Sequence, residues 1–280
     1  MTPLCFEFFS KFLHENSGLS LQEEKQYLLE SRLNGVLKKH NFETFEDLMS
    51  AVRSDPNGAI GLDVIDSMSV TETSFFRDRK PFDMLVDQML PEIIANRSPT
   101  QPIRIWSAAA SSGQEAYTVA MLCKENENLL AGRRVEILAT DISETVLEKA
   151  KSGIYSQFEV QRGLPTNFML QYLEQVGEMW TLTPEIKSMV QFKQFNLMHP
   201  FAGLPKFDII FCRNVLIYFD VETKTKIFEK LHSVMADDGY LLLGGAETVM
   251  GLSQDLVADE SHRTLFRSKG YSPQRKALSA

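Results

Sequence analysis

The sequence has 280 residues, of which 44% are hydrophobic and 24% charged, and its formal net charge is −8. These proportions are typical of globular proteins and argue against a disordered or membrane class, while the acidic balance argues against nucleic acid as the main partner, because phosphate binding requires an excess of Lys and Arg. No apolar run approaches the roughly 20 residues that span a bilayer, and the N-terminus lacks the pattern of a secretory signal, so we expect a cytoplasmic protein without membrane insertion.

Residues 1 to about 70 show apolar residues at helical spacing and no strand pattern. Ser20 followed by Glu23 has the form of a capping box at the start of a second helix, and Asn41 follows the basic end of that helix. The pattern predicts a helical domain over residues 1–80.

A helix and a polar loop are expected over residues 81–102, before a second domain over residues 103–271. There, strands and helices alternate, which predicts a doubly wound, mostly parallel α/β sheet with right-handed crossovers. The expected strands are 103–108, 134–140, 207–212 and 239–244, and the expected helices are 114–125, 143–151 and 221–236.

The alternation stops between Lys151 and Lys206. Residues 179–183 and 190–195 alternate apolar and polar side chains, which predicts a small antiparallel excursion. The last residues, 272–280, have no apolar periodicity and are expected to form a disordered tail.

In an open parallel sheet a ligand binds beyond the carboxyl ends of the strands. The first strand is followed by small side chains over residues 107–113, and then by Glu115. This segment lacks the G-x-G-x-x-G fingerprint of dinucleotide sites, which favours a ligand without a diphosphate. S-adenosylmethionine is such a ligand, and an acidic residue near its sulfonium cation makes electrostatic sense.

Other polar residues follow the later strands. Asp141 ends the second strand, where a carboxylate commonly accepts hydrogen bonds from ribose hydroxyls, although it could instead cap the next helix. Arg213, Asn214 and Tyr218 follow the strand over residues 207–212. They are expected at the same crevice, with solvated loop residues as the alternative.

The segment Thr71–Asp78 offers hydroxyls, two Phe rings and the guanidinium of Arg77. By composition alone it is equally compatible with a buried Phe pair beside a solvated arginine. The three cysteines are far apart and have no metal-ligand or disulfide spacing, so we expect buried thiols and no metal.

Three segments, Thr73–Asp78, Trp106–Glu115 and Phe211–Phe219, closely resemble the motifs of the CheR family of chemotaxis receptor glutamate methyltransferases. The resemblance runs from about residue 5 to residue 268. It implies a class I S-adenosylmethionine-dependent methyltransferase domain, a preceding helical domain and a small antiparallel β-subdomain inserted near residues 176–195.

Carried over by motif position, the resemblance implies a set of residues that contact S-adenosylmethionine and its product S-adenosylhomocysteine: Thr71, Thr73, Arg77, Glu115, Asp141, Asn196, Leu197, Arg213 and Asn214. Thr71 stands where many relatives have Asn, and Gln114 stands where they have Glu. The sequence between Gly177 and Trp180 is short and lacks the glycine-rich loop with which some relatives grip a receptor pentapeptide, so we expect activity without that tether.

A glutamate carboxylate, with a reference pKa near 4.3, is already ionised at neutral pH, so its methylation needs no general base. We therefore expect Arg77 and Tyr218 to be the catalytic pair, acting by orienting the carboxylate. The family uses its helical domain for docking on the cytoplasmic helical domain of methyl-accepting chemotaxis receptors. Four basic residues predicted on the second helix could serve this purpose or form an ordinary solvated face, namely Lys25, Arg32, Lys38 and Lys39.

We expect a monomer. Two alternative functions stay open at this stage: an S-adenosylmethionine-dependent methyltransferase for another substrate, and a non-catalytic regulator that senses the same ligand. A dinucleotide oxidoreductase ranks last, because its glycine fingerprint is absent.

Overall fold

The structure is a computed structural model that describes residues 1–260 and 262–271. The predicted tail over residues 272–280 lies outside the described residues. Helices account for the first 68 residues, as expected, and they are α1 (Pro3–Ser17), η1 (Glu23–Lys25), α2 (Gln26–His40), α3 (Phe45–Ser54) and α4 (Ala59–Met68). Their apolar faces enclose a separate core that includes Phe9, Leu13, Leu29 and Leu33, all fully buried.

The helix boundaries confirm one sequence signal and correct another. Asn41 ends α2 in the left-handed conformation, with φ 58°, as its position predicts. Ser20 does not cap the second helix, because η1 precedes α2 and the chain before it is extended; the Ser20 N–H instead donates to the carbonyl of Tyr218. A capping box does form at Thr44 and Asp47, at the start of α3.

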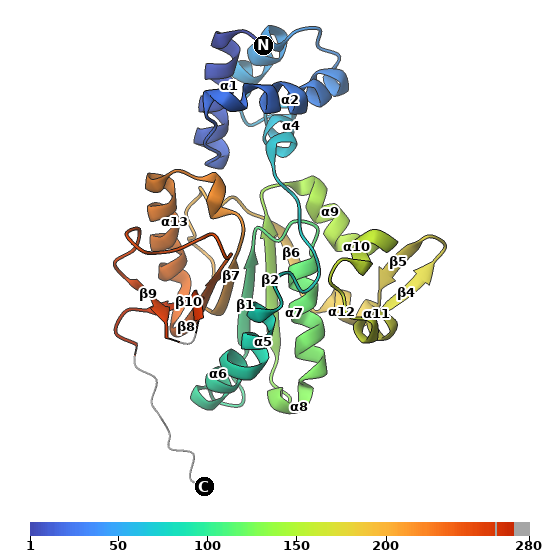
Figure 1. Cartoon of the computed structure of the whole chain (residues 1–280), viewed down its shortest axis with the longest axis vertical. Coiled ribbons are helices and arrows are strands. Elements are labelled where there is room, and N and C mark those ends of the chain that lie inside the picture. Colours follow the sequence, from blue (N-terminus) through green and yellow to red (C-terminus); the bar gives the residue numbers. More distant parts are fainter. Residues whose placement is uncertain (261, 272–280) are drawn as a thin grey trace.

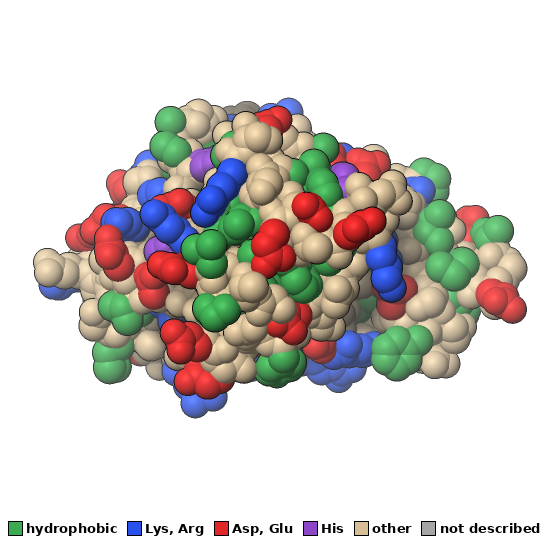
Figure 2. All heavy atoms as spheres, turned by 90° about the horizontal axis from the view of Figure 1, so that it is seen from above, with side chains coloured by type: hydrophobic (Ala, Val, Ile, Leu, Met, Phe, Trp, Pro, Cys, Tyr) green, Lys and Arg blue, Asp and Glu red, His purple; other side chains and the backbone are tan. Residues whose placement is uncertain are grey.

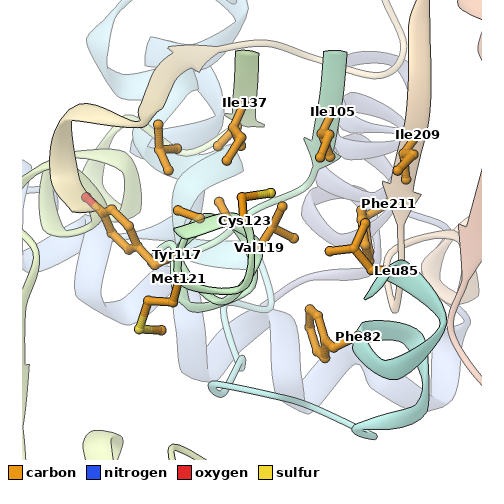
Figure 3. Close-up of a cluster of buried hydrophobic side chains, with 14 of the residues drawn as sticks. Phe82, Leu85, Ile105, Tyr117, Val119, Met121, Cys123, Ile137, Ile209 and Phe211 are labelled. Carbon is orange, nitrogen blue, oxygen red and sulfur yellow. The ribbon is translucent and has the colours of Figure 1, made fainter. Parts of the chain in front are cut away.

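A continuous helical segment links this domain to the sheet and consists of α5 (Lys80–Met84), the π-helical η2 (Leu85–Met89) and α6 (Leu90–Asn96). Phe82 stacks on Phe211 of the central strand, with ring centroids 6.0 Å apart. Figure 3 shows Phe82 and Leu85 facing Ile209 and Phe211, while Val119 lies nearer Ile105 and Ile137. The linker therefore belongs to the hydrophobic layer that covers one face of the sheet.

The main sheet has the strand order β6-β2-β1-β7-β8-β10-β9. Five neighbouring strands are parallel, and β10 and β9 are antiparallel at one edge. The strands are β1 (Ile103–Ala108), β2 (Val135–Asp141), β6 (Val190–Gln194), β7 (Phe207–Cys212), β8 (Met235–Leu243), β9 (Leu256–Asp259) and β10 (His262–Ser268). The flanking helices are α7 (Gln114–Glu125), α8 (Glu127–Leu130), α9 (Glu144–Ser152) and α13 (Val221–Val234).

The predicted alternation is thus confirmed, and three of its elements, β1, α7 and β7, have the expected bounds. Strands β9 and β10 were not predicted. β9 is short and half of its residues are exposed, so its sequence has little of the apolar pattern by which a strand is recognised.

The small antiparallel sheet exists, but one of its predicted strands is wrong. It has the order β3-β5-β4, formed by β3 (Ile154–Ser156), β4 (Leu173–Val176) and β5 (Met179–Leu182), and it carries α10 (Gln157–Gln161), α11 (Thr166–Tyr172) and α12 (Pro184–Ser188). Residues 190–195, expected in this subdomain, instead supply β6, which pairs in parallel with β2. Strand β5 pairs with β4 because a two-residue turn, Gly177–Glu178, makes β4 its nearest neighbour.

Within the described residues, no helix combines the length and the apolar character needed to cross a membrane. Figure 1 shows the helical domain lying over one end of the main sheet, with the antiparallel subdomain to one side. Contacts join the helical domain to the loops at this end, including His14 Nε2 with Asp220 Oδ2 at 2.6 Å and Asn196 Nδ2 donating to the Asn16 carbonyl at 2.6 Å. The helical domain therefore closes the crevice where a sheet of this type binds its ligand.

Candidate functional site

The main cavity lies between the helical domain and the carboxyl ends of β1, β2 and β7. It holds about 1060 Å³ of empty space, part of which is open to solvent. Eight of the nine residues expected to contact a cofactor line it, and so does Tyr218: Thr73, Arg77, Glu115, Asp141, Asn196, Leu197, Arg213 and Asn214.

The turn after β1 forms one wall of the main cavity. Ala109 and Ser111 lie in the left-handed region, with φ 60° and 51°, which is uncommon for residues other than glycine and is often found at functional sites. Gly113 has φ 92°, and a Cβ there would lie 3.0 Å from the Cβ of Ala150, so glycine is required. The small side chains predicted to admit a ligand thus also permit a strained, close-packed turn.

Asp141 ties this turn to the end of β2. Its carboxylate accepts the N–H of Ser111 at 2.8 Å and the N–H of Ser143 at 3.0 Å. Ser143, not Asp141, caps α9 through the N–H of Val146, so the capping role considered for Asp141 belongs to its neighbour. Burial raises the pKa of Asp141, although hydrogen bonds from backbone N–H groups lower it.

Glu115 and Arg213 form a buried ion pair between α7 and the end of β7. Arg213 Nη1 lies 2.9 Å from Glu115 Oε2, and Arg213 Nη2 lies 2.6 Å from Asp78 Oδ2. Ser107 donates to the other oxygen of Glu115 at 2.8 Å. The Arg213 side chain is only 2% exposed, so it fixes the two acidic residues in place as well as lining the cavity.

Arg77 and Tyr218 both line the main cavity, and they come from segments far apart in the sequence. Arg77 Nη1 donates to the carbonyl of Glu72 at 3.1 Å, and this is its only side-chain hydrogen bond among the described residues. Burial raises the pKa of the Tyr218 phenol, while the Arg77 guanidinium lowers it, so the phenol is a neutral donor at physiological pH. Both groups retain hydrogen-bonding capacity toward the cavity.

Thr71 is the one expected residue that does not line the main cavity. Its side chain is exposed, and its carbonyl accepts the hydroxyl of Ser111 at 2.6 Å. Asn196, in contrast, lines the cavity while joining the two domains, because its Oδ1 accepts the Met198 N–H at 2.8 Å and its Nδ2 contacts α1.

Sequence reasoning missed the part of the lining that the helical domain supplies. Ser17 is the last residue of α1 and Leu19 follows the helix, while Ile65 and Met68 belong to α4. These residues carry no chemical motif and no signal that could identify them, because their role depends only on how the helical domain lies on the sheet.

An adjoining groove continues from the main cavity and shares Leu19, Met68, Val70, Tyr218 and Phe219 with it. The groove runs between the start of α2 and the loop before α13, and it also encloses about 1040 Å³ of space open to solvent. Three basic side chains line it, namely Lys25, Arg32 and Lys224. Tyr218 thus lies where the two spaces meet.

No three His, Cys, Asp or Glu side chains lie close enough to hold a metal ion anywhere in residues 1–260 and 262–271. All three thiols are buried and reduced, as the cysteine spacing predicts.

Comparison with known families gives two matches that together cover most of the chain. The family described as "CheR methyltransferase, SAM binding domain" matches residues 71–264, and "CheR methyltransferase, all-alpha domain" matches residues 5–62. The first spans the main sheet except for the end of β10, and the second spans most of the helical domain.

Two curated relatives show the same likeness over nearly full length. "Chemotaxis protein methyltransferase Cher2" of Pseudomonas putida is 41% identical over 253 residues, covering 89% of this chain and 92% of that protein. "Chemotaxis protein methyltransferase" of Vibrio parahaemolyticus is 41% identical over 248 residues, covering 88% and 89%. Among solved structures, PKMT2 from Rickettsia typhi aligns with a TM-score of 0.37 and 13% identity over 62% of this chain and 26% of that one, a likeness too low to carry an argument.

Proposed function

Because this chain belongs to the CheR methyltransferase family, we propose that it transfers the methyl group of S-adenosylmethionine to glutamate side chains of bacterial chemoreceptors, forming glutamate methyl esters. Methylation of chemoreceptors with S-adenosylmethionine is the activity that the family and the named relatives support. The observation that carries the choice of a glutamate acceptor is the position of Tyr218 and a basic groove directly beside the main cavity.

The main cavity fits S-adenosylmethionine by the chemistry of its donors. Carboxylates of Glu115 and Asp141 suit a cation and ribose hydroxyls, while Leu197 and Phe195 offer apolar surface for an adenine ring. No glycine-rich diphosphate cradle is present in the turn after β1. The eight lining residues named above are therefore proposed as the cofactor-binding set, and Thr71 is proposed to act only through its backbone contact with Ser111.

The bound cofactor would supply an electrophilic methyl group. A bond forms between a carboxylate oxygen and the methyl carbon, while the bond from that carbon to sulfur breaks and its electron pair returns to sulfur. The acceptor carboxylate is ionised at neutral pH, so the protein has no proton to remove. What its residues must do is exclude water and hold the carboxylate in line, an alignment worth roughly 7–11 kcal/mol.

Arg77 and Tyr218 are the proposed catalytic pair. The guanidinium has spare N–H donors and the neutral phenol has a free O–H, so each can donate to one oxygen of the acceptor carboxylate. A bidentate clamp by Arg77 alone would withdraw charge from the nucleophile, whereas one contact from each residue leaves a lone pair directed at the methyl group.

The adjoining groove is proposed to receive the receptor segment that carries the glutamate. Of its basic residues, Arg32 is engaged by the carbonyls of Ser67 and Ser69, at 3.2 and 2.9 Å, so it helps hold the end of α4. Lys25 and Lys224 form no salt bridge with a described residue and are the better candidates to attract an acidic helix.

The other two basic residues expected to dock the receptor lie outside the adjoining groove. Lys39 pairs with Asp63 at 2.8 Å, and Lys38 lies on the exposed side of α2. Figure 2 shows Lys and Arg interspersed with Asp and Glu over this end of the molecule rather than gathered into one patch. Of the four residues expected to dock the receptor, Lys25 alone is proposed to do so, and Lys224, which was not expected, joins it.

Independence from a receptor pentapeptide is also proposed. The β4–β5 hairpin closes through only Gly177 and Glu178, with Val176 paired to Met179, which leaves no loop to grip a tether. The test is titration of a receptor C-terminal pentapeptide into the pure protein, and micromolar binding would contradict the proposal. We further propose that the protein acts as a monomer on the cytoplasmic helical domain of the receptor, which sedimentation of the free protein and its receptor complex would test.

The central experiment is transfer of labelled methyl to chemoreceptor-containing membranes, followed by mild base, which releases methanol from an ester. Base-labile label on the receptor is expected from the wild type. Tyr218→Phe and Arg77→Ala are each expected to lower kcat by about 10- to 100-fold. Of the two variants, Tyr218→Phe should keep the S-adenosylhomocysteine affinity closer to that of the wild type. Cofactor binding without label would favour another substrate or a regulatory role.

A further inference from the structure

Glu247 is a buried carboxylate that lies four residues beyond β8 and lines neither the main cavity nor the adjoining groove. We propose that Glu247 is a positioning residue for methyl transfer, one that holds the 213–219 loop in the shape that presents Asn214 to the cofactor and Tyr218 to the acceptor. The effect on methyl transfer rests on the proposed function, whereas the support that Glu247 gives to the loop does not depend on it.

Four backbone N–H groups converge on this single carboxylate. Oε1 accepts from Val215 at 3.0 Å and from Leu216 at 2.8 Å. Oε2 accepts from Asn214 at 2.8 Å and from Gly244 at 2.6 Å. Glu247 is 8% exposed, and no cationic side chain pairs with it in the described part of the chain, so backbone dipoles alone balance its charge.

The bonded amides belong to the segment that needs support. Asn214 has φ 59°, a left-handed conformation that costs free energy unless its surroundings hold it. Val215 and Leu216 precede or begin the short 3₁₀ helix Leu216–Tyr218, whose first N–H groups have no partner within the helix itself. The carboxylate satisfies these amides and thereby fixes the direction in which the chain leads to Tyr218.

Gly244 shows independently that the backbone packs closely around the Glu247 carboxylate. A Cβ at Gly244 would lie 2.7 Å from Asn214 Nδ2, 2.7 Å from Glu247 Oε2 and 2.9 Å from Asn214 N. Its φ is not in the left-handed region, so glycine is needed here for space and not for backbone freedom. The end of β8 therefore approaches the 213–219 loop as closely as a glycine allows.

The direct test compares Glu247→Gln with Asp208→Asn. Gln keeps the shape but replaces one acceptor oxygen with an NH₂ group that faces N–H donors. Asp208 is the control, because it is a buried carboxylate that also accepts a backbone N–H, that of Arg104 at 2.8 Å, but lies at the opposite end of β7 and pairs there with Arg97 at 2.7 Å. Two readouts need no methyl transfer: amide hydrogen exchange over residues 213–219, and S-adenosylhomocysteine affinity by calorimetry.

We expect Glu247→Gln to speed exchange of the Asn214–Leu216 amides and to weaken S-adenosylhomocysteine binding by about tenfold or more, because buried donors lose their acceptor. Asp208→Asn is expected to lower the melting temperature without either change. In the receptor assay, Glu247→Gln should lower kcat by a larger factor than it changes the KM for the receptor.

Unchanged exchange and affinity in folded Glu247→Gln, or equal changes in Asp208→Asn, would overturn the proposal. If Glu247→Gln does not fold, Gly244→Ala provides the second variant, since its added Cβ displaces Asn214 and Glu247 while keeping the carboxylate. The same exchange and affinity pattern is expected from it, and a wild-type pattern would count against the role. Absence of receptor methylation in the wild type would affect the proposed function and leave these two readouts intact.

Discussion

Replacement of Arg213 by Met tests whether the buried Glu115–Arg213 pair holds the main cavity together. Met is flexible and apolar but shorter and uncharged, so the change leaves Glu115 buried with an uncompensated carboxylate, 12% exposed and supported only by the Ser107 hydroxyl. Loss of one partner of a buried pair costs about 3–5 kcal/mol. Asp78 adds little to this cost, because its side chain is 55% exposed and can be hydrated.

The magnitude can be isolated with a double-mutant cycle. Glu115→Gln and Arg213→Met together remove both charges, so the double variant is expected to be more stable than the sum of the single effects predicts, by about 2–3 kcal/mol. Arg104→Met is a suitable control, because Arg104 pairs with Glu136 on the same sheet but both side chains are about one third exposed, and its loss should cost no more than about 1 kcal/mol.

The assay is urea unfolding followed by tryptophan fluorescence. Both tryptophans of the sequence, Trp106 in β1 and Trp180 in β5, lie outside the helical domain, so their signal reports the part of the molecule that contains Arg213. A loss below about 1 kcal/mol for Arg213→Met, or strict additivity in the double variant, would refute the view that this pair is a structural element of the cavity.

Three further outcomes are expected. Asp220→Asn keeps an equally good helix cap but removes a carboxylate whose pKa is lowered to about 2 by hydrogen bonds from Thr223 and His14. The stabilisation from this carboxylate is present above its usual pKa of 3.8 and is lost as pH falls through about 2. Melting temperatures across that range should therefore show the variant less stable by at most about 1 kcal/mol at neutral pH and equal to wild type near pH 2. Phe211→Ala should cost about 3–5 kcal/mol in urea unfolding, because it empties the contact of the linker with the central strand. Lys25→Glu should raise the KM for the receptor about tenfold at low salt without changing S-adenosylhomocysteine affinity, whereas Lys38→Glu, outside the adjoining groove, should change neither.

The sequence alone determined four strands of the main sheet, β1, β2, β7 and β8, and the helices α7, α9 and α13 between them, because each of these buried strands and amphipathic helices carries its own apolar period. It also placed the polar residues that follow β1, β2 and β7, since parallel topology brings strand ends to one edge whatever the remaining structure is. Eight expected cofactor residues and Tyr218 therefore meet in one cavity.

Local patterns were insufficient to predict strand pairing and helix capping where contacts between distant segments determine them. Residues 190–194 alternate like an antiparallel strand, yet they pair in parallel with β2, because a two-residue turn had already given β5 its partner. Ser20 has the form of a cap, but the chain around it binds the loop of Tyr218 instead.

Some functional features could likewise be predicted from the sequence, and others only from the tertiary structure. The residue types at strand ends indicated a methyl donor site, but the walls supplied by α1 and α4, the basic groove beside Tyr218 and the four amides that converge on Glu247 became visible only in three dimensions. The physical reason is that periodicity and capping act within a few residues, whereas a cavity is formed by segments that meet only when the chain has folded.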